Sequence, residues 1–246
     1  LLDGRLLNII SKRLPQNLIT HGELDTFLFD KSEVTAVDLS DAFFQMPLSL
    51  DSQPFTAFFS PLHGKRFCFT RCPQGLKNSP LYLKLLMDKL FGDMADEVIT
   101  YADDILIATK GTFEEHMRVV NKVLQRIREG KIKIRPQKIN LARKEIDFLG
   151  MVWTEGKLSI PKAKTLAFQN LPSPNTPKKA KSVICALAYY RKFVPNFAQL
   201  SQPIMDLSIL HPKEFKWTEQ HENLFRRLIR QICKHAQRYL PDPKKP

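Results

Sequence analysis

The sequence lacks several features that would place it in other classes of protein. No apolar run approaches the roughly 20 residues that a membrane-spanning helix needs, so we expect no membrane partner. There is no internal repeat and no low-complexity tract. The chain begins without methionine and without the charged start, apolar middle and cleavage site of a signal peptide. We therefore expect a segment cut from a longer polypeptide.

Cysteine is scarce, and its spacing argues against a zinc site. Of the four cysteines, Cys68 and Cys72 form a CxxxC pair, and no histidine or second cysteine pair lies at the spacing of zinc ligands. We interpret the four as core or surface thiols of a protein in a reducing compartment such as the cytoplasm.

Acidic residues are also few relative to basic ones. The chain has 25 Asp and Glu against 38 Lys and Arg, which gives a formal net charge of +13 and a pI of about 9.6. This surplus favours a polyanionic partner, although charge alone also fits a basic protein without nucleic acid. Two basic clusters each fit either a solvated face or contacts to the backbone of a duplex. They are Lys131, Lys133, Arg135, Lys138, Arg143 and Lys144, and then Lys162, Lys164, Lys178, Lys179 and Lys181.

The hydropathy pattern predicts a mixed α and β chain. Strand-like runs cover 34–38, 55–59, 65–70, 97–100 and 105–109, followed by a β-rich stretch over 132–160. Helical patterns cover 79–91, 113–129, 176–193 and 218–234. Three prolines within 171–177 predict a linker, and we expect 241–246 to be unstructured.

The helix after residue 112 has the clearest pattern. Thr112 and Glu115 form a capping box, and Gly130 follows the last turn. His116 is expected on the exposed flank, without a role. The apolar residues expected on one face are Phe113, Met117, Val120, Leu124 and Ile127.

Three carboxylates carry the strongest chemical signal. Asp103 and Asp104 follow Tyr101 and Ala102 in a tight turn between two strands, where two adjacent negative charges are costly unless a cation neutralises them. Taken alone, this segment fits a polar turn equally well. Asp38 ends an apolar strand, where a lone buried charge is unfavourable. We expect the three to converge and hold two hard cations for phosphoryl transfer.

Four sequence motifs occur in an order that is specific to one family of proteins. Asp38 with Phe43, the run Pro73-Gln74-Gly75-Leu76-Lys77-Asn78-Ser79-Pro80, Tyr101-Ala102-Asp103-Asp104 and Phe148-Leu149-Gly150 follow one another along the chain. This set resembles the reverse transcriptases of retroviruses and of Ty3/gypsy-like LTR retrotransposons. The resemblance implies an RNA- and DNA-templated DNA polymerase that acts on deoxynucleotides with Mg²⁺, or with Mn²⁺ as an alternative. It also implies a cytoplasmic protein that can reside in a virus-like particle.

The resemblance also implies a role for each site residue. Asp38 and Asp103 are the direct metal ligands, Asp104 is the third carboxylate and the Leu39 carbonyl adds a contact. Phe43 is the steric gate against a ribonucleotide 2′-hydroxyl. The remaining nucleotide contacts are Asp41, Ala42, Gln74, Gly75, Tyr101 and Ala102, and the primer grip is Leu149, Gly150 and Met151. Without the resemblance, Phe43 also fits a core residue, Gln74-Gly75 a plain turn, and Gly150 a bulge glycine.

The implied fold is α+β, a right-hand polymerase with an antiparallel-sheet palm, partial fingers and a helical thumb. Its expected boundaries are fingers 1–30 and 54–78, palm 31–53 and 79–156, thumb 157–210, and the start of a connection region 211–246. The thumb is expected from Leu187-x-x-Tyr190-x-x-Phe193 and from Phe215-x-Trp217. Asp3-x-Arg5-x-x-Asn8 matches a fingers motif imperfectly, and the basic residues that grip the triphosphate in this family precede that motif.

Three other functions compete with a polymerase. The first is a non-catalytic nucleic-acid-binding remnant of a retroelement. A two-metal nuclease is disfavoured because no general base accompanies the carboxylates. A viral RNA-dependent RNA polymerase usually carries Gly-Asp-Asp and a small residue in place of Phe43. Expected partners are an RNA template, a DNA primer or template, and deoxynucleotides, and the sequence does not indicate the oligomeric state.

Overall fold

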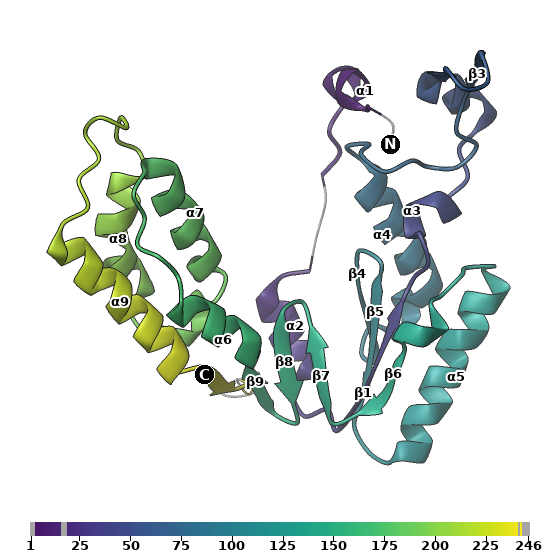
Figure 1. Ribbon diagram of the computed structural model, residues 1–246. Helices are drawn as coiled ribbons and strands as arrows, with labels where there is room; N and C mark the ends of the chain where they lie inside the picture. The colour runs from purple at the N-terminus through teal and green to yellow at the C-terminus, as the bar shows by residue number, and fades with distance from the viewer. Residues whose placement is uncertain (1–2, 16–18, 241, 243–246) are drawn as a thin grey trace. The chain divides into compact units, whose positions relative to one another are not determined.

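The computed structural model describes residues 3–15, 19–240 and 242. The chain forms two compact units, one of residues 1–146 with 241–246 and one of residues 147–240. Both mix helices and strands, as the sequence predicts (Figure 1). The tail that was expected to be unstructured lies outside the described residues apart from Asp242. The subdomain boundaries stay a prediction.

An antiparallel sheet forms the base of the first unit. Its strand order is β4-β5-β1-β6, with β1 at Glu33–Asp38, β4 at Val98–Tyr101, β5 at Asp104–Thr109 and β6 at Asn140–Arg143. The expected tight hairpin is confirmed, because Tyr101 pairs with Asp104 across a two-residue loop. β5 is buried at five successive positions, which explains its continuous run of apolar residues.

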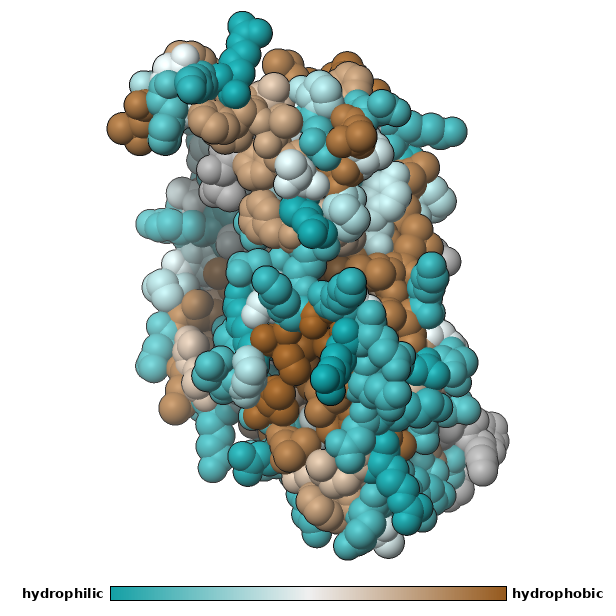
Figure 2. Space-filling model, turned by 90° about the vertical axis from the view of Figure 1, so that its right-hand side faces the viewer, coloured by the Kyte–Doolittle hydropathy of each residue, from teal (hydrophilic) through white to brown (hydrophobic). Residues whose placement is uncertain are grey.

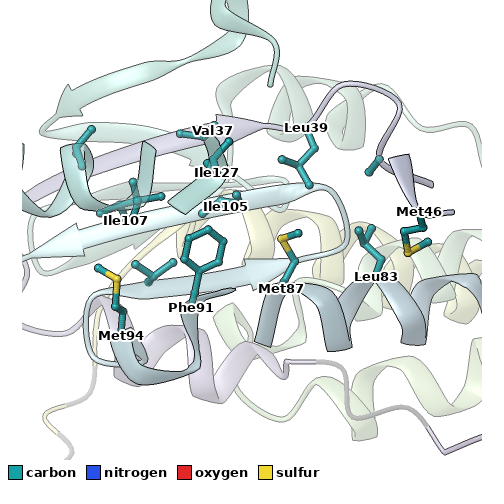
Figure 3. Packing of buried hydrophobic residues seen from close by; sticks show 14 of the residues in the cluster. Val37, Leu39, Met46, Leu83, Met87, Phe91, Met94, Ile105, Ile107 and Ile127 are labelled. Carbon is teal, nitrogen blue, oxygen red and sulfur yellow. The ribbon is translucent and has the colours of Figure 1, made fainter. Parts of the chain in front are cut away.

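Two helices cover the sheet of the first unit and close its core. They are α4 at Ser79–Phe91 and α5 at Phe113–Glu129. Figure 3 shows the strands and helices contributing side chains to one packed cluster. Each such large apolar side chain contributes roughly 1.5–3 kcal/mol when fully buried. The labelled members are Val37, Leu39, Met46, Leu83, Met87, Phe91, Met94, Ile105, Ile107 and Ile127.

Helix α5 begins as predicted, and four residues of its expected apolar face pack inward: Val120 and Ile127 are buried, and Met117 and Leu124 pack partly buried against the core. Its capping box is confirmed, with the Glu115 N–H donating to the Thr112 hydroxyl at 3.3 Å. Phe113, however, is 52% exposed. The expectation that His116 is exposed was wrong, because its ring is buried between the Thr35 and Thr109 hydroxyls at 2.7 and 2.8 Å. The buried face consists of His116, Val120, Val123 and Ile127.

The expected fingers elements also lie in the first unit. They comprise α1 at Arg5–Ile10, α2 at His21–Leu28, and the hairpin of β2 at Phe58–Ser60 with β3 at Lys65–Phe67. The short helix α3 at Ala42–Gln45 lies in the expected palm segment. The hairpin is confirmed but shorter than predicted, since Leu50–Thr56 forms a 3₁₀ helix. Figure 2 shows hydrophobic residues reaching the surface at this end of the unit, and Phe58, Phe59 and Leu62 are exposed there.

The second unit combines a sheet with four helices. Its sheet has the order β10-β9-β8-β7, from β7 at Glu145–Phe148, β8 at Met151–Thr154, β9 at Lys157–Ser159 and β10 at Gln237–Tyr239. β7 begins in the first unit and continues into the second. The helices are α6 at Lys162–Gln169, α7 at Pro177–Ala188, α8 at Phe197–Leu207 and α9 at Glu219–Lys234.

Two predictions for the second unit have different outcomes. The last helix is confirmed, and its apolar stripe is buried at Phe225, Leu228, Ile229 and Ile232. The helix expected over 176–193 ends at Ala188, because the chain then tightens into a 3₁₀ turn over Arg191–Phe193. Its apolar spacing continues beyond Ala188, so periodicity alone did not show where the helix ends.

Candidate active site

The antiparallel register brings the three carboxylates to one end of the palm hairpin. Asp38, the last residue of β1, is paired with Asp104, the first residue of β5. Directly opposed residues of this kind have Cα atoms about 4.5–5.5 Å apart. The Leu39 N–H donates to the Asp103 carbonyl at 2.9 Å, which ties the turn to the chain after Asp38. The predicted convergence of Asp38 with the Asp103-Asp104 turn is therefore confirmed.

The turn that carries the aspartates has a strained backbone. Ala102, the first of its two loop residues, has φ of 50°. A non-glycine residue in the left-handed region costs roughly 1–2 kcal/mol. Two-residue hairpin loops favour positive φ because this matches the twist of the strands that they connect. The backbone thus accepts a local cost and places Asp103 at an exposed tip beside Asp104.

The site is short of positive charge. Burial raises the pKa of Asp104, and the neighbouring charges of Asp103 and Asp38 raise it further. The Asp38 side chain is only 17% exposed, and its buried Oδ2 accepts no hydrogen bond from the described residues. Arg135 Nη1 lies 3.5 Å from this oxygen, and Lys138 Nζ lies 3.5 Å from Oδ1. These contacts are too long to satisfy a buried carboxylate fully.

Hard oxygen donors of this kind are the ligands that Mg²⁺ prefers. Within the described part of the chain, no three His, Cys, Asp or Glu side chains are arranged as they stand to hold a metal ion. The fit to a divalent cation therefore depends on two observations. One is the donor chemistry of the three aspartates, and the other is the buried Asp38 oxygen that lacks a hydrogen bond.

The segment after α5 supplies the basic side chains at the site. The Arg135 N–H donates to the Asp38 carbonyl, and the Ser40 N–H donates to the Lys133 carbonyl, both at 2.9 Å. Gln45 adds a clamp, with Nε2 donating to the Lys133 carbonyl at 2.9 Å. Sequence reasoning placed Arg135 and Lys138 in a basic cluster that fits either a solvated face or duplex contacts, and it missed their position beside Asp38. Residues nearly a hundred positions apart gave no local signal of this pairing.

The residues expected to line the nucleotide pocket follow β1 directly. Asp41 has φ of 46° and precedes α3, and its carboxylate lies 3.5 Å from Arg135 Nη2. Leu39 and Ala42 are buried in the core, and Phe43 packs against the same cluster while remaining partly exposed. Phe43 therefore has one part in the core and another that is accessible. Its core and gate interpretations are compatible.

The loop that carries Gln74 and Gly75 is held by the expected fingers motif. Gly75 has φ of 96°, a conformation that glycine adopts without a steric penalty. Asn8 Nδ2 donates to the Gly75 carbonyl at 2.7 Å, and the Lys77 N–H donates to Asn8 Oδ1 at 2.7 Å. Gln74 and Gly75 are both exposed. Asn8 thus fixes the loop, a contact that the motif alone did not reveal.

The remaining expected residues divide between the two units. Tyr101 and Ala102 lie on the palm turn beside Asp103. Leu149, Gly150 and Met151 lie in the second unit, where the first two form the turn between β7 and β8 and Met151 is buried.

Comparison with known proteins identifies the family. The family model described as "Reverse transcriptase (RNA-dependent DNA polymerase)" matches residues 13–153. This chain belongs to the reverse transcriptase family. It is 31% identical over 227 residues to the Gag-Pol polyprotein of Woolly monkey sarcoma virus, covering 86% of this chain and 13% of that protein. Identity to the Pro-Pol polyprotein of Feline foamy virus is 30% over 234 residues, covering 94% and 20%.

Solved reverse transcriptase structures share the fold. One match is to the foamy viral protease-reverse transcriptase in complex with dsDNA, with a TM-score of 0.87 and 30% identity over 99% of this chain and 51% of that one. The same kind of protein in complex with an RNA/DNA hybrid matches with a TM-score of 0.84 and 29% identity, over 95% and 31%. The predicted family and the α+β polymerase fold are confirmed. The chain spans only about an eighth to a fifth of the two curated relatives described above.

Proposed function

We propose that this chain is the polymerase part of a reverse transcriptase, which extends a DNA primer along an RNA or DNA template. The observation that carries the proposal is the pairing of Asp38 with Asp104 beside Asp103. The buried Asp38 oxygen without a hydrogen bond and the raised pKa of Asp104 add support, since a cation held by the three carboxylates would offset both. The related structures with bound dsDNA and RNA/DNA hybrid support the choice of nucleic-acid partner.

In this proposal each acidic group has a defined task. Asp38 and Asp103 hold the two divalent cations, the Leu39 carbonyl adds an oxygen, and Asp104 supports the pair. When bound, Mg²⁺ or Mn²⁺ would lower the pKa of the primer 3′-hydroxyl and would stabilise the pyrophosphate leaving group. Arg135 and Lys138 partly balance the carboxylates when no cation is present, because each lies 3.5 Å from an Asp38 oxygen.

The nucleotide pocket follows from the elements around these groups. Phe43 lies under the incoming sugar and excludes a 2′-hydroxyl, while its packing against the core holds the ring in place. The backbone of Asp41 and Ala42 faces the triphosphate. Gln74 contacts the sugar, and Gly75 lets the template strand approach. Tyr101 and Ala102 contact the nucleotide and the primer end.

Residues of both units contact the duplex in this proposal. Leu149, Gly150 and Met151 form the primer grip, which holds the primer 3′ end. The basic clusters at 131–144 and 162–181 bind phosphates without regard to sequence. Each neutralised phosphate adds roughly 0.7–0.9 to the slope of binding affinity against salt concentration.

A primer-extension assay tests the proposal. The chain is mixed with a labelled primer on RNA and on DNA templates, with deoxynucleotides and with Mg²⁺ or Mn²⁺. We expect stepwise extension on both templates and none in the presence of EDTA. Duplex binding without extension under every metal condition would contradict the proposal and favour a non-catalytic nucleic-acid-binding remnant. Binding is measured separately by fluorescence anisotropy, so the two outcomes are distinguished.

A further inference from the structure

Two adjacent tyrosines hold the turn between β7 and β8. The Tyr190 hydroxyl donates to the Gly150 carbonyl at 3.1 Å, and the Tyr189 hydroxyl donates to the Leu149 carbonyl. Two consecutive side chains thus reach two consecutive carbonyls of one two-residue turn. All four residues lie within the second unit.

The two tyrosines follow the end of α7 and pack against each other. Helix α7 ends at Ala188, and the Tyr190 N–H bonds to the Leu187 carbonyl in a tighter turn. The two phenol rings meet edge to face with centroids 5.0 Å apart. Adjacent residues of a helical turn point about 100° or more apart, so it is the length of the two side chains that lets both hydroxyls reach one turn.

The surroundings fix the Tyr190 ring more firmly than the Tyr189 ring. Tyr190 is only 5% exposed and meets Phe168 of α6 edge to face at 5.4 Å. Burial raises the pKa of its hydroxyl, which therefore remains a proton donor. Tyr189 is partly exposed. Tyr190 is thus the rigid anchor, and Tyr189 is the second, more accessible contact.

The turn itself offers its carbonyls to these donors. Leu149 has φ of 49° and Gly150 has φ of 66°. Both residues lie in the loop of a two-residue hairpin, outside the hydrogen-bonded ladder of the strands. A Cβ at position 150 would stand 3.7 Å from the Tyr190 hydroxyl, an ordinary contact. The tyrosines therefore fit closely over the turn without compressing it.

We propose that Tyr189 and Tyr190 are positioning residues that fix the primer-grip turn to the end of helix α7. This rests on the proposed function, because it takes the turn at Leu149-Gly150 as the part that holds the primer 3′ end. Movement of α7 with the duplex is then transmitted to the turn through two hydroxyl groups. The chemistry of the reaction is unaffected, and only the fraction of bound primers that are correctly placed depends on the pair.

The test compares Tyr189→Phe, Tyr190→Phe and the double variant with Tyr239→Phe as a matched control. Phenylalanine removes only the hydroxyl. Tyr239 is 74% exposed in the same unit, on β10. Three quantities are measured: duplex affinity, the fluorescence of 2-aminopurine as the primer 3′ base, and the amplitude of the first-turnover burst of extension. Circular dichroism and thermal unfolding verify that each variant is folded.

In the double variant, the ratio of correctly placed to misplaced primer ends, which the burst amplitude reports, should fall about tenfold, equivalent to about 1.4 kcal/mol. Its 2-aminopurine signal should shift toward that of free duplex, while duplex affinity changes less than about twofold, equivalent to about 0.4 kcal/mol. Tyr239→Phe should match the wild type. An unchanged burst and unchanged fluorescence in a folded double variant would overturn the proposal.

The outcomes also separate this inference from the proposed function. A wild-type chain that binds duplex but never extends it refutes the proposed function, and the fluorescence of the primer 3′ base still reports on the tyrosines. A wild-type chain that extends normally, with a double variant equal to it in burst and fluorescence, refutes only the positioning role. Equal loss of duplex affinity and burst would assign the tyrosines to general stability of the unit and would also overturn the proposal.

Discussion

Two of the tight hairpin turns begin with the same backbone conformation and have different supports. Ala102 in the palm hairpin has φ of 50°, and Leu149 in the β7–β8 hairpin has φ of 49°. In the first turn, the next residue is Asp103, whose carbonyl accepts a hydrogen bond from the N–H of Leu39, the residue that follows β1. In the second, the next residue is Gly150, and two tyrosine hydroxyls contact the loop carbonyls. One turn is braced by backbone and the other by side chains.

The difference follows from what each turn has to hold. The carboxylates of the palm turn must keep a fixed position relative to Asp38, which lies on the paired strand, so the sheet itself provides the brace. Further along the same strands, buried His116 bonds to Thr35 of β1 and Thr109 of β5. The second turn instead contacts the end of a helix. Side-chain hydroxyls suit that contact, because a rotation of the helix can move them.

The largest expected effect comes from removing a charge at the palm turn. Asp103→Asn should reduce primer extension at least about a thousandfold, equivalent to about 4 kcal/mol of transition-state stabilisation. Duplex affinity should stay within about threefold, a change of under 1 kcal/mol. The measurements are single-turnover extension and anisotropy. Extension at the wild-type rate would show that Asp103 is not a metal ligand. The palm turn would then lose the chemical role that distinguishes it from the β7–β8 turn.

A second effect concerns the selection of deoxynucleotides over ribonucleotides. It should depend on Phe43, near the palm turn, and not on the tyrosines at the β7–β8 turn. Phe43→Val should lower the preference for deoxynucleotides over ribonucleotides by roughly 10–100-fold, the range expected when one steric contact is relieved. The measurement is kcat/KM for each nucleotide. Tyr190→Phe serves as the control and should leave this ratio unchanged. Unchanged discrimination in Phe43→Val would leave Phe43 with a core role only.

A third effect tests the buried brace of the palm strands. His116→Leu leaves two threonine hydroxyls without their buried partner and should cost about 2 kcal/mol of unfolding free energy. The exposed His211→Leu is the control and should be nearly neutral. Denaturant unfolding measures both. A cost below about 0.5 kcal/mol, the usual range for a surface substitution, would contradict the structural role of His116.

The same histidine predicts a pH dependence. Burial lowers the pKa of His116 despite the opposing charge of Glu33, so the folded state favours the neutral ring. Stability should be fully present above the ordinary histidine value of 6.5 and should fall as the pH drops below it. Unfolding curves between pH 8 and about 5 measure this dependence. His116→Leu should remove this part of the pH dependence, and an identical profile in the variant would assign it elsewhere.

The smallest effects are expected from the carboxylate beside the palm turn. The raised pKa of Asp104 means that its charged form opposes folding. Asp104→Asn should therefore raise the thermal midpoint slightly at neutral pH, although extension falls. This gain should vanish as the pH drops below the ordinary aspartate value of 3.8. The exposed Asp147→Asn, just before the second turn, is the matched control. A lower midpoint in Asp104→Asn would contradict this account of the charges.

Much of the fold could be predicted from local patterns. Helix α4, the α5 capping box, the palm hairpin and α9 each depend on signals within one segment of chain, such as Pro80 at a helix start or Thr112 three residues before Glu115. The grouping of Asp38 with Asp103 and Asp104 was predictable because strand ends and turns collect at sheet edges. The motif order then identified the family.

The errors came from long-range contacts. From the sequence, His116 was predicted to be a polar surface residue. In the structure it is buried, and both of its hydrogen bonds are to residues of other elements, Thr35 and Thr109. Nothing in the sequence indicated that the Arg135 backbone pairs with Asp38, which lies far away in the chain. The early end of α7 is coupled to a turn 40 residues away in the chain. Such contacts depend on tertiary packing, which the periodicity of one segment does not encode.

The most direct measurement counts the divalent ions that the aspartates hold. Mn²⁺ bound to the chain is quantified by electron paramagnetic resonance in the presence of a dideoxy-terminated primer–template and the next matching nucleotide. The wild type and the exposed-site control Asp51→Asn should each hold about two ions at the site in this complex, one of which the nucleotide brings. Asp38→Asn and Asp103→Asn should each hold at most about one. An equal count in the wild type and both variants would contradict a metal site at the Asp38, Asp103 and Asp104 carboxylates.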